Sequence, residues 1–261
     1  SLTTIHDILA QFRDEELHNR HLGDRFERLI CRYLELDPIF ADQFSNVWMW
    51  NEWPKKGNTG DIGIDIVAEE RATGEFCGIQ CKFYLPEHTL SKDDIDSFLN
   101  ALGDKRFTSG IIISTTDKWG ANAEKSLQNR DKPVRRMRVQ DLDDSPIDWS
   151  KFSLKNPQAL SLRTKKKLRP HQTAAKTDVT TGLAEADRGK LIMACGTGKT
   201  FTSLKIAEEI AGKNKLVLFL VPSLNLLSQS LTEWTQESGL PLHSFAVCSD
   251  AEVGKKRDKN D

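Results

Sequence analysis

Apolar residues recur at two different spacings along this chain, and the change of spacing separates helices from strands. In residues 23–35 they recur every three or four positions, which predicts an amphipathic helix. Its apolar face holds Phe26, Leu29, Ile30, Tyr33 and Leu34. Farther along, the pattern predicts a strand within 77–84, a polar helix at 91–102, an apolar strand at 109–116 and a helix beginning near Trp119. This order predicts an α/β domain with a mixed central sheet flanked by helices.

The second half of the chain again alternates apolar runs with helical patterns. A helix enters at Pro170, because proline suits the first helical turn. The apolar run before residue 195 predicts a strand, and residues 202–212 predict a helix. Residues 215–234 read as a buried strand followed by an amphipathic helix, and 243–250 as another strand. We therefore expect a second α/β unit.

The boundary between the two halves lies within residues 143–165. This stretch contains Pro146 and Pro157, but Ile147, Trp149 and Phe152 are too apolar for a free tether. We expect it to pack on one or both domains. The predicted organisation is thus a domain at 1–145, a packed linker at 146–165 and a second domain at 166–261.

Three tryptophans, Trp48, Trp50 and Trp53, stand close together and could stack on nucleic-acid bases. The alternation of Trp48 and Trp50 fits a strand with one buried face equally well. We favour the core interpretation.

Composition is that of an ordinary globular protein, with 38% hydrophobic and 29% charged residues. No apolar run approaches the roughly 18 to 20 residues of a membrane span, and the first residues lack a basic, signal-like region. We expect a cytoplasmic protein with no membrane partner. The 5 cysteines lack paired spacing, which argues against a disulfide framework or a zinc site.

Charge is distributed unevenly. Residues 1–150 contain 19 Lys and Arg against 27 Asp and Glu, a net charge of −8, whereas residues 151–261 carry +7. A basic half suits a polyanionic partner. The acidic half also contains basic clusters, which either make local phosphate contacts or form a solvated surface. They consist of Lys55, Lys56, Arg135, Arg136 and Arg138.

The candidate chemistry of the first half lies at Asp65, Gln80 and Lys82. On two adjacent strands of a hairpin, an acid at the end of the first strand lies beside alternate residues of the second, so Gln80 and Lys82 point the same way, toward Asp65. A carboxylate and an amide oxygen suit Mg²⁺, and an ammonium stabilises developing charge. Glu27 sits at the edge of an apolar helix face, where a buried glutamate requires a partner.

These residues resemble the PD-(D/E)xK nucleases, in the Mrr-like branch where Gln replaces the second acid. Residues 23–27 match the GxxFE motif of that branch. The resemblance implies a restriction-endonuclease fold in which Asp65, Glu27 and Gln80 hold Mg²⁺ and Lys82 stabilises the transition state or orients water. Asp61 is either a second ligand or a turn residue.

A second site stands at residues 193–200, between an apolar run and a helix. A strand, a Gly-rich turn and a helix are the context that phosphate binding requires. Gly196 and Gly198 let the backbone approach phosphates, with Thr197 between them. Lys199 reaches the β and γ phosphates, and the Thr200 hydroxyl takes Mg²⁺.

This stretch resembles the superfamily 2 helicases and translocases, which have a RecA-like domain and bind ATP with Mg²⁺; Met193 stands where the strict pattern has Gly. The resemblance implies that Gln172, with Arg169 nearby, reads the adenine edge. No DExH-type tetrapeptide follows Asp250. We therefore expect a truncated motor domain that binds nucleotide weakly and does not turn it over.

An Mrr-like nuclease directly ahead of such a motor resembles the N-terminus of the single-chain, ATP-dependent restriction-modification enzymes of Type ISP. Type I motor subunits usually carry ExK, so Gln80 favours Type ISP. The resemblance implies an Mg²⁺-dependent endonuclease on double-stranded DNA, coupled to an ATP-driven translocase, with further motor, methyltransferase and target-recognition domains in the same polypeptide. Two alternatives remain: a repair nuclease-helicase without a methyltransferase, and a catalytically silent DNA-binding or docking module.

Overall fold

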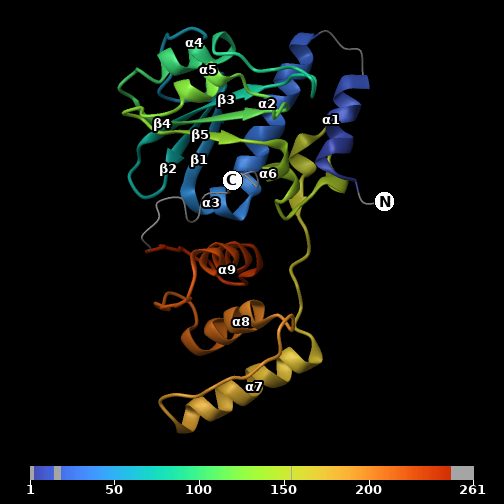
Figure 1. Ribbon diagram of the computed structural model, residues 1–261, viewed down its shortest axis with the longest axis vertical. Helices are drawn as coiled ribbons and strands as arrows, with labels where there is room; N and C mark the ends of the chain where they lie inside the picture. The colour runs from blue at the N-terminus through green and yellow to red at the C-terminus, as the bar shows by residue number, and fades with distance from the viewer. Residues whose placement is uncertain (1–2, 15–18, 154, 248–261) are drawn as a thin grey trace. The chain divides into compact units, whose positions relative to one another are not determined.

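A computed structural model describes residues 3–14, 19–153 and 155–247. The chain divides into two compact units, which Figure 1 shows in ribbon form: the first comprises Ser1–Arg163 and the second Thr164–Asp261.

The first unit is built on one sheet of mixed direction. Its strands are, in chain order and in spatial order, β1 (Phe44–Met49), β2 (Ile66–Glu70), β3 (Phe76–Lys82), β4 (Phe107–Ser114) and β5 (Val134–Met137). Pairing is antiparallel from β1 to β3 and parallel from β3 to β5. The predicted mixed α/β fold is confirmed.

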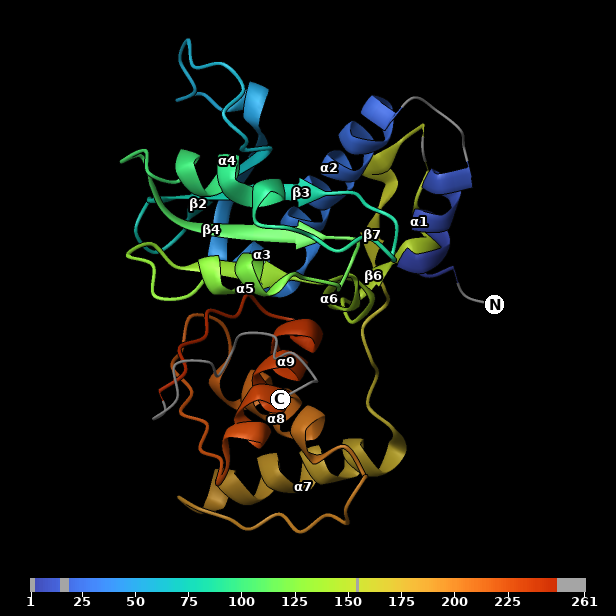
Figure 2. The same cartoon turned by 45° about the horizontal axis from the view of Figure 1, so that its top comes forward.

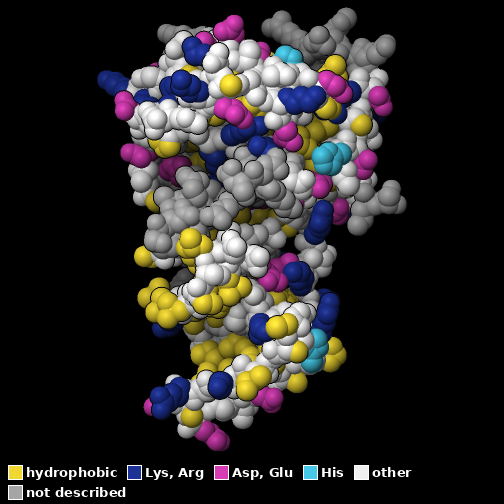
Figure 3. Space-filling model, viewed as in Figure 1, with side chains coloured by type: hydrophobic (Ala, Val, Ile, Leu, Met, Phe, Trp, Pro, Cys, Tyr) yellow, Lys and Arg dark blue, Asp and Glu magenta, His cyan; other side chains and the backbone are white. Residues whose placement is uncertain are grey.

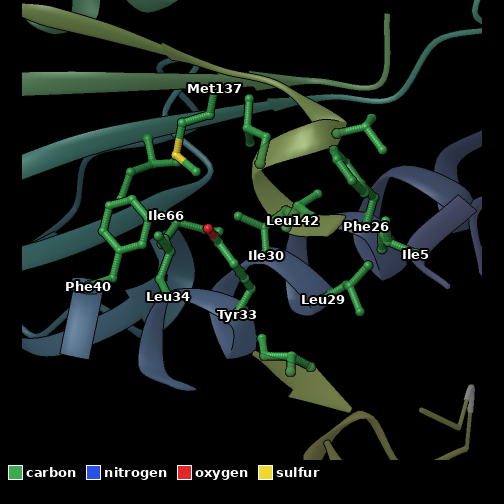
Figure 4. Packing of buried hydrophobic residues seen from close by; sticks show 14 of the residues in the cluster. Ile5, Phe26, Leu29, Ile30, Tyr33, Leu34, Phe40, Ile66, Met137 and Leu142 are labelled. Carbon is green, nitrogen blue, oxygen red and sulfur yellow. The ribbon is translucent and has the colours of Figure 1, made fainter. Parts of the chain in front are cut away.

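Helices cover both faces of this sheet. Alternate residues of β3 point to opposite faces, so they pack in two different cores. Cys77 and Ile79 pack in a core with α1 (Ile5–Asp14), α2 (Asn19–Leu36), α3 (Pro38–Gln43) and α6 (Val139–Asp143). Figure 4 shows the apolar face of α2 entering this core. On the other face, Phe76 packs with α4 (Asp93–Ala101) and α5 (Ala121–Ser126).

The described residues of the segment 146–163 belong to the first unit, whereas Thr164 and Lys165 belong to the second. Strand β6 (Ile147–Asp148) pairs antiparallel with β7 (Ser161–Leu162), and two short 3₁₀ helices lie between them, η2 (Trp149–Lys151) and η3 (Pro157–Ala159). Ile147 and Trp149 are buried in the core that contains α2. Their apolar character therefore reflects packing.

Two of the three clustered tryptophans belong to the core, as we expected. Trp50 and Trp53 are 5% and 3% exposed; Trp50 begins the 3₁₀ helix η1 (Trp50–Glu52) that follows β1, and Trp53 comes directly after it. Trp48 is half-buried and lies beside the Phe76 ring. Base stacking by Trp50 or Trp53 is not compatible with this burial.

The contact between β4 and α4 depends on Gly110, and replacing this residue by Ala is expected to destabilise the first unit by about 1–3 kcal/mol. A Cβ there would lie 2.5 Å from Leu102 Cδ1 and 3.1 Å from Phe98 Cζ. The matched control is G23A, because Gly23 lies within α2 with nothing within 4 Å of a Cβ, and Ala should stabilise that helix by roughly 0.5–1 kcal/mol. Calorimetric unfolding of both variants checks the pair; equal melting temperatures would contradict it.

The second unit consists of three helices packed around a small core. They are α7 (Pro170–Glu185), α8 (Lys199–Ala211) and α9 (Leu224–Glu237), close to their predicted positions. Phe201, Leu204 and Trp234 form the buried centre.

The strands that we expected in the second unit are not formed among the described residues, and this expectation was wrong. The apolar side chains of those segments are exposed, as at Ile192 (83%), Leu216 (96%) and Leu218 (81%), and hydrophobic side chains appear on the surface of this unit in Figure 3. A strand of this buried type needs neighbouring strands and a cover on both faces. The described residues supply neither. Residues 248–250 of the last expected strand lie outside them.

None of the helices in the described ranges combines the length and the apolar character that crossing a bilayer requires.

Candidate active site and nucleotide site

Asp65 directly precedes β2, with its backbone held from both sides. Its N–H donates to Ile79 O on β3 at 2.9 Å, and its carbonyl accepts from Trp50 N at 2.8 Å. The side chain is fixed as well, because Asp65 Oδ2 accepts the Cys81 N–H at 2.7 Å. The carboxylate is therefore held against β3 between Gln80 and Lys82.

Gln80 and Lys82 lie at the end of β3, where alternation puts both on the α4 face. Gln80 is 4% exposed and its Nε2 donates to Gly63 O at 3.1 Å. Among the described residues, nothing hydrogen-bonds to the buried Gln80 Oε1. A buried amide oxygen without a partner is costly, so this atom is suited to a ligand.

The charge of Asp65 interacts with the charges of two other predicted site residues. Burial raises the pKa of Asp65 to about 6, although the Cys81 N–H and the Lys82 ammonium lower it. Burial also raises the pKa of Glu27 to about 8, and the Asp65 charge adds to that increase. Asp65 thus interacts electrostatically both with Glu27 of α2 and with Lys82 of β3.

This donor set fits a hard divalent cation. Two carboxylates with raised pKa values and an unpaired amide oxygen would all be stabilised by a nearby positive charge. Within the described ranges, no three His, Cys, Asp or Glu side chains form a metal-binding group. Mg²⁺ tolerates such a set, because it usually retains several waters and takes only one or two protein carboxylates.

Asp61 has the contact of a turn residue. Its Oδ1 accepts the Gly63 N–H at 2.9 Å, the bond of an Asx-turn. Its side chain is exposed, although its charge contributes to the raised pKa values of Glu27 and Asp65. This geometry favours the turn interpretation over that of a ligand.

Two of the basic side chains considered for phosphate contacts stabilise the fold instead. The Arg135 guanidinium lies over the Phe40 ring at 5.2 Å, and that of Arg136 lies over Trp119 at 4.4 Å. Arg136 also donates to Asp117 O at 2.8 Å. These contacts favour a structural role.

The Gly-rich turn of the second unit has the backbone that phosphate binding requires. Gly196 and Gly198 have φ values of 76° and 81°, which favour glycine, and Lys199 begins α8. The Lys199 ammonium donates to Met193 O at 3.2 Å and to Ala194 O at 3.4 Å. Thr200 follows in the first turn of α8. An open cavity of about 340 Å³ adjoins the turn, lined in part by Arg169, Gln172, Gly196, Thr197 and Gly198.

Gln172 holds the turn through both ends of its amide. Its Nε2 donates to Thr197 O at 2.9 Å, and its Oε1 accepts the Arg169 N–H at 2.9 Å. It is 5% exposed. Both ends of the amide are thus bonded within the protein, which supports a role in positioning the turn. Adenine could bind to Gln172 only by displacing these hydrogen bonds. A Cβ at Gly198 would lie too close to Gln172 Nε2, so a side chain there would require the Gln172 amide to move.

The comparisons with known proteins agree with this division of the chain. A family model described as restriction endonuclease (Mrr_cat_2) matches residues 35–159, and one described as the res subunit of Type III restriction enzymes (ResIII) matches residues 165–261. Asp65, Gln80 and Lys82 fall within the first match, whereas Glu27 precedes it. A search of curated proteins gave no match.

The chain is therefore a restriction endonuclease domain of the Mrr type followed by a helicase-like domain. Among solved structures, it is similar to the ATP-dependent Type ISP restriction-modification enzyme LlaBIII bound to DNA, with 36% identity and a TM-score of 0.74. The alignment covers 91% of this chain and 15% of the LlaBIII chain. The predicted order of a nuclease ahead of a helicase-like region is confirmed.

Proposed function

We propose that the first unit is an Mg²⁺-dependent endonuclease that hydrolyses phosphodiester bonds of double-stranded DNA. The observation that carries this proposal is the shared electrostatics of Glu27, Asp65 and Lys82 beside the unpaired Gln80 Oε1. LlaBIII, to which the chain is similar, is described as a DNA-bound restriction-modification enzyme. We also propose that the reaction takes place in the cytoplasm.

Each residue has a separate role in this proposal. Asp65, Glu27 and the Gln80 amide oxygen would hold the ion, whose chemistry when bound is to polarise the scissile phosphate and lower the pKa of bound water. Lys82 would stabilise the charge that develops on the phosphate. The Cys81 N–H keeps the Asp65 carboxylate in place throughout.

We further propose that the second unit binds ATP with Mg²⁺ at residues 196–200, as the φ values of Gly196 and Gly198 support. ATP turnover and DNA translocation belong to a longer protein, because the chain spans only 15% of LlaBIII. By similarity, that protein would add the remaining motor, a methyltransferase and a target-recognition domain. The resulting activity would be restriction of foreign DNA.

The test of the nuclease is plasmid nicking by the parent chain and by K82A. We expect Mg²⁺-dependent nicking by the parent and a loss of about a hundredfold or more in K82A, because Lys82 supplies charge stabilisation in the transition state. Mn²⁺ binding, measured by calorimetry, should survive in K82A, since Lys82 is not a ligand. K118A is the matched control, because Lys118 is exposed and lies beyond β4.

The same pair of measurements separates the nuclease from a silent DNA-binding module. A module that only docks on DNA has no reason to take up Mn²⁺ and would not nick. Nicking by K82A at the parent rate would show that the assignment of Lys82 is wrong.

A further inference from the structure

Residues 53–60 connect η1 to the segment that leads into Asp65, and we call them the 53–60 loop. They contain Lys55 and Lys56 and no Asp or Glu, in a half of the chain whose net charge is −8. In Figure 2 the light-blue chain between β1 and β2 rises clear of the sheet. The loop therefore presents positive charge beside an acidic site.

The loop is braced, so it is ordered before any partner arrives. Trp53, at its start, packs against the Phe76 and Phe107 rings with centroids 5.2 and 5.4 Å apart. The Arg106 guanidinium lies 5.1 Å from the Trp53 ring and donates to Lys55 O at 2.8 Å. Arg106 is itself held by an ion pair with Asp104 at 2.8 Å. A loop fixed in this way loses little entropy on binding.

Neither lysine of the loop is neutralised. The Lys55 ammonium lies 4.7 Å from the centre of the Phe76 ring, and the Lys56 ammonium donates to Asn51 Oδ1 at 2.9 Å. In the described part of the chain neither forms an ion pair with a carboxylate, whereas Arg106 and Arg136 do. Both charges thus remain available to a polyanion.

The loop is connected to the segment that carries Asp65. Trp50 ties the loop to the site, because its N–H donates to Asp65 O and its Nε1 to Gly60 O. Lys55 lies over Phe76, which pairs with Glu69. At about 3.3 Å per residue this is roughly 13 Å along β2 from Asp65. This distance is shorter than one helical turn of duplex DNA, about 34 Å, so a duplex held at Asp65 is long enough to reach the loop.

We propose that the 53–60 loop is a contact surface for duplex DNA, with Lys55 and Lys56 binding backbone phosphates within one helical turn of the bond that is cut. The inference rests on the proposed nuclease function, because it takes the DNA to be positioned by Asp65 and Lys82. It also accounts for how an acidic unit holds a polyanion: the brace of Trp53 and Arg106 keeps two cations at a fixed distance from the carboxylates.

The test is the salt dependence of DNA binding. A fluorescein-labelled duplex is titrated with the parent chain, K55Q/K56Q and K55R/K56R in EDTA, so that no DNA is cut. For K55Q/K56Q we expect a higher Kd and a slope of log K against log salt that is shallower by about 1.8, since each phosphate contact contributes about 0.9. K55R/K56R should retain the parent slope. The matched control is K151Q/K155Q, which removes two exposed charges outside the loop.

The outcomes distinguish this inference from the function on which it rests. If the parent nicks plasmid with Mg²⁺ but K55Q/K56Q keeps its Kd and slope, the loop assignment is overturned and the nuclease stands. An equal loss of slope in K151Q/K155Q also overturns it, because the contact would then be diffuse. If the parent neither binds duplex nor nicks it, the proposed function fails and the inference fails with it.

Discussion

Replacing Asp65 by Ala or Asn is expected to reduce DNA nicking at least about a hundredfold, to the background of the assay. The side chain is half-buried against β3 and is the ligand candidate whose position is fixed by a hydrogen bond from the backbone. Both variants should lose Mn²⁺ binding in calorimetry. Both should still bind a fluorescent ATP analogue as the parent does, because the nucleotide site lies in the other unit.

The two replacements should differ in stability. Asn keeps an acceptor for the Cys81 N–H, whereas Ala leaves that amide without its partner. Because the pKa of Asp65 is raised from 3.8 to about 6, the folded state holds the proton more tightly than the unfolded state. Stability is therefore lost as pH rises from about 4 through about 6.

D65N avoids that loss. In EDTA above pH 6 it should melt at or above the temperature of the parent, and D65A below D65N. A D65N chain that nicks as fast as the parent would remove Asp65 from the mechanism. A D65N chain that melts below the parent above pH 6 would show that the Asp65 charge is not unfavourable, and one that melts below D65A would show that the acceptor for the Cys81 N–H does not stabilise the fold.

The sequence was sufficient for the parts of the site that depend on local periodicity. Helix α2 could be predicted because its apolar residues recur at helical spacing, and that spacing also places Glu27 at the edge of the face. The antiparallel pairing of β2 with β3 brings Asp65 beside Gln80 and Lys82, as the hairpin argument required. Asp65, however, directly precedes β2, whereas we had expected it to lie at the end of the first strand of the hairpin.

Contacts between residues far apart in the sequence could not be predicted. The Gln80 amide donates to the backbone carbonyl of Gly63, and the Arg106 guanidinium donates to that of Lys55. Every residue has a backbone carbonyl, so the sequence does not show which one accepts the bond. For the same reason the sequence did not show the contacts of Arg135 and Gln172. A guanidinium can stack on an aromatic ring, and an amide can bind a backbone carbonyl, as readily as either can bind a ligand.

The strands expected in the second unit show that a local sequence pattern is not sufficient to predict a strand. Residues 215–221 have the composition of a buried strand, but a strand is stabilised by its neighbours in a sheet more than by its own composition. The helices α7, α8 and α9 need no such partners, because their hydrogen bonds are internal. They form close to their predicted positions, whereas the strands do not.

Binding of a divalent cation to the first unit is expected to strengthen by roughly tenfold per pH unit between pH 6 and 8. At pH 7 Asp65, with a pKa of about 6, is mostly ionised, whereas Glu27, with a pKa of about 8, is mostly protonated. A cation must therefore displace the proton of Glu27, and its affinity follows the ionised fraction of that carboxyl. Above pH 8 the dependence should level off.

Calorimetric titration with Mn²⁺ in two buffers of different ionisation enthalpy measures this directly. The parent should release about one proton per ion at pH 7. E27Q should release almost none and bind more weakly, with little pH dependence above pH 7, because only Asp65 remains to ionise. E75Q, in which an exposed carboxyl at the far end of β3 is removed, should behave as the parent. Equal affinity at pH 6 and 8, or undiminished proton release in E27Q, would place Glu27 outside the metal site and leave Asp65 and Gln80 as the protein ligands.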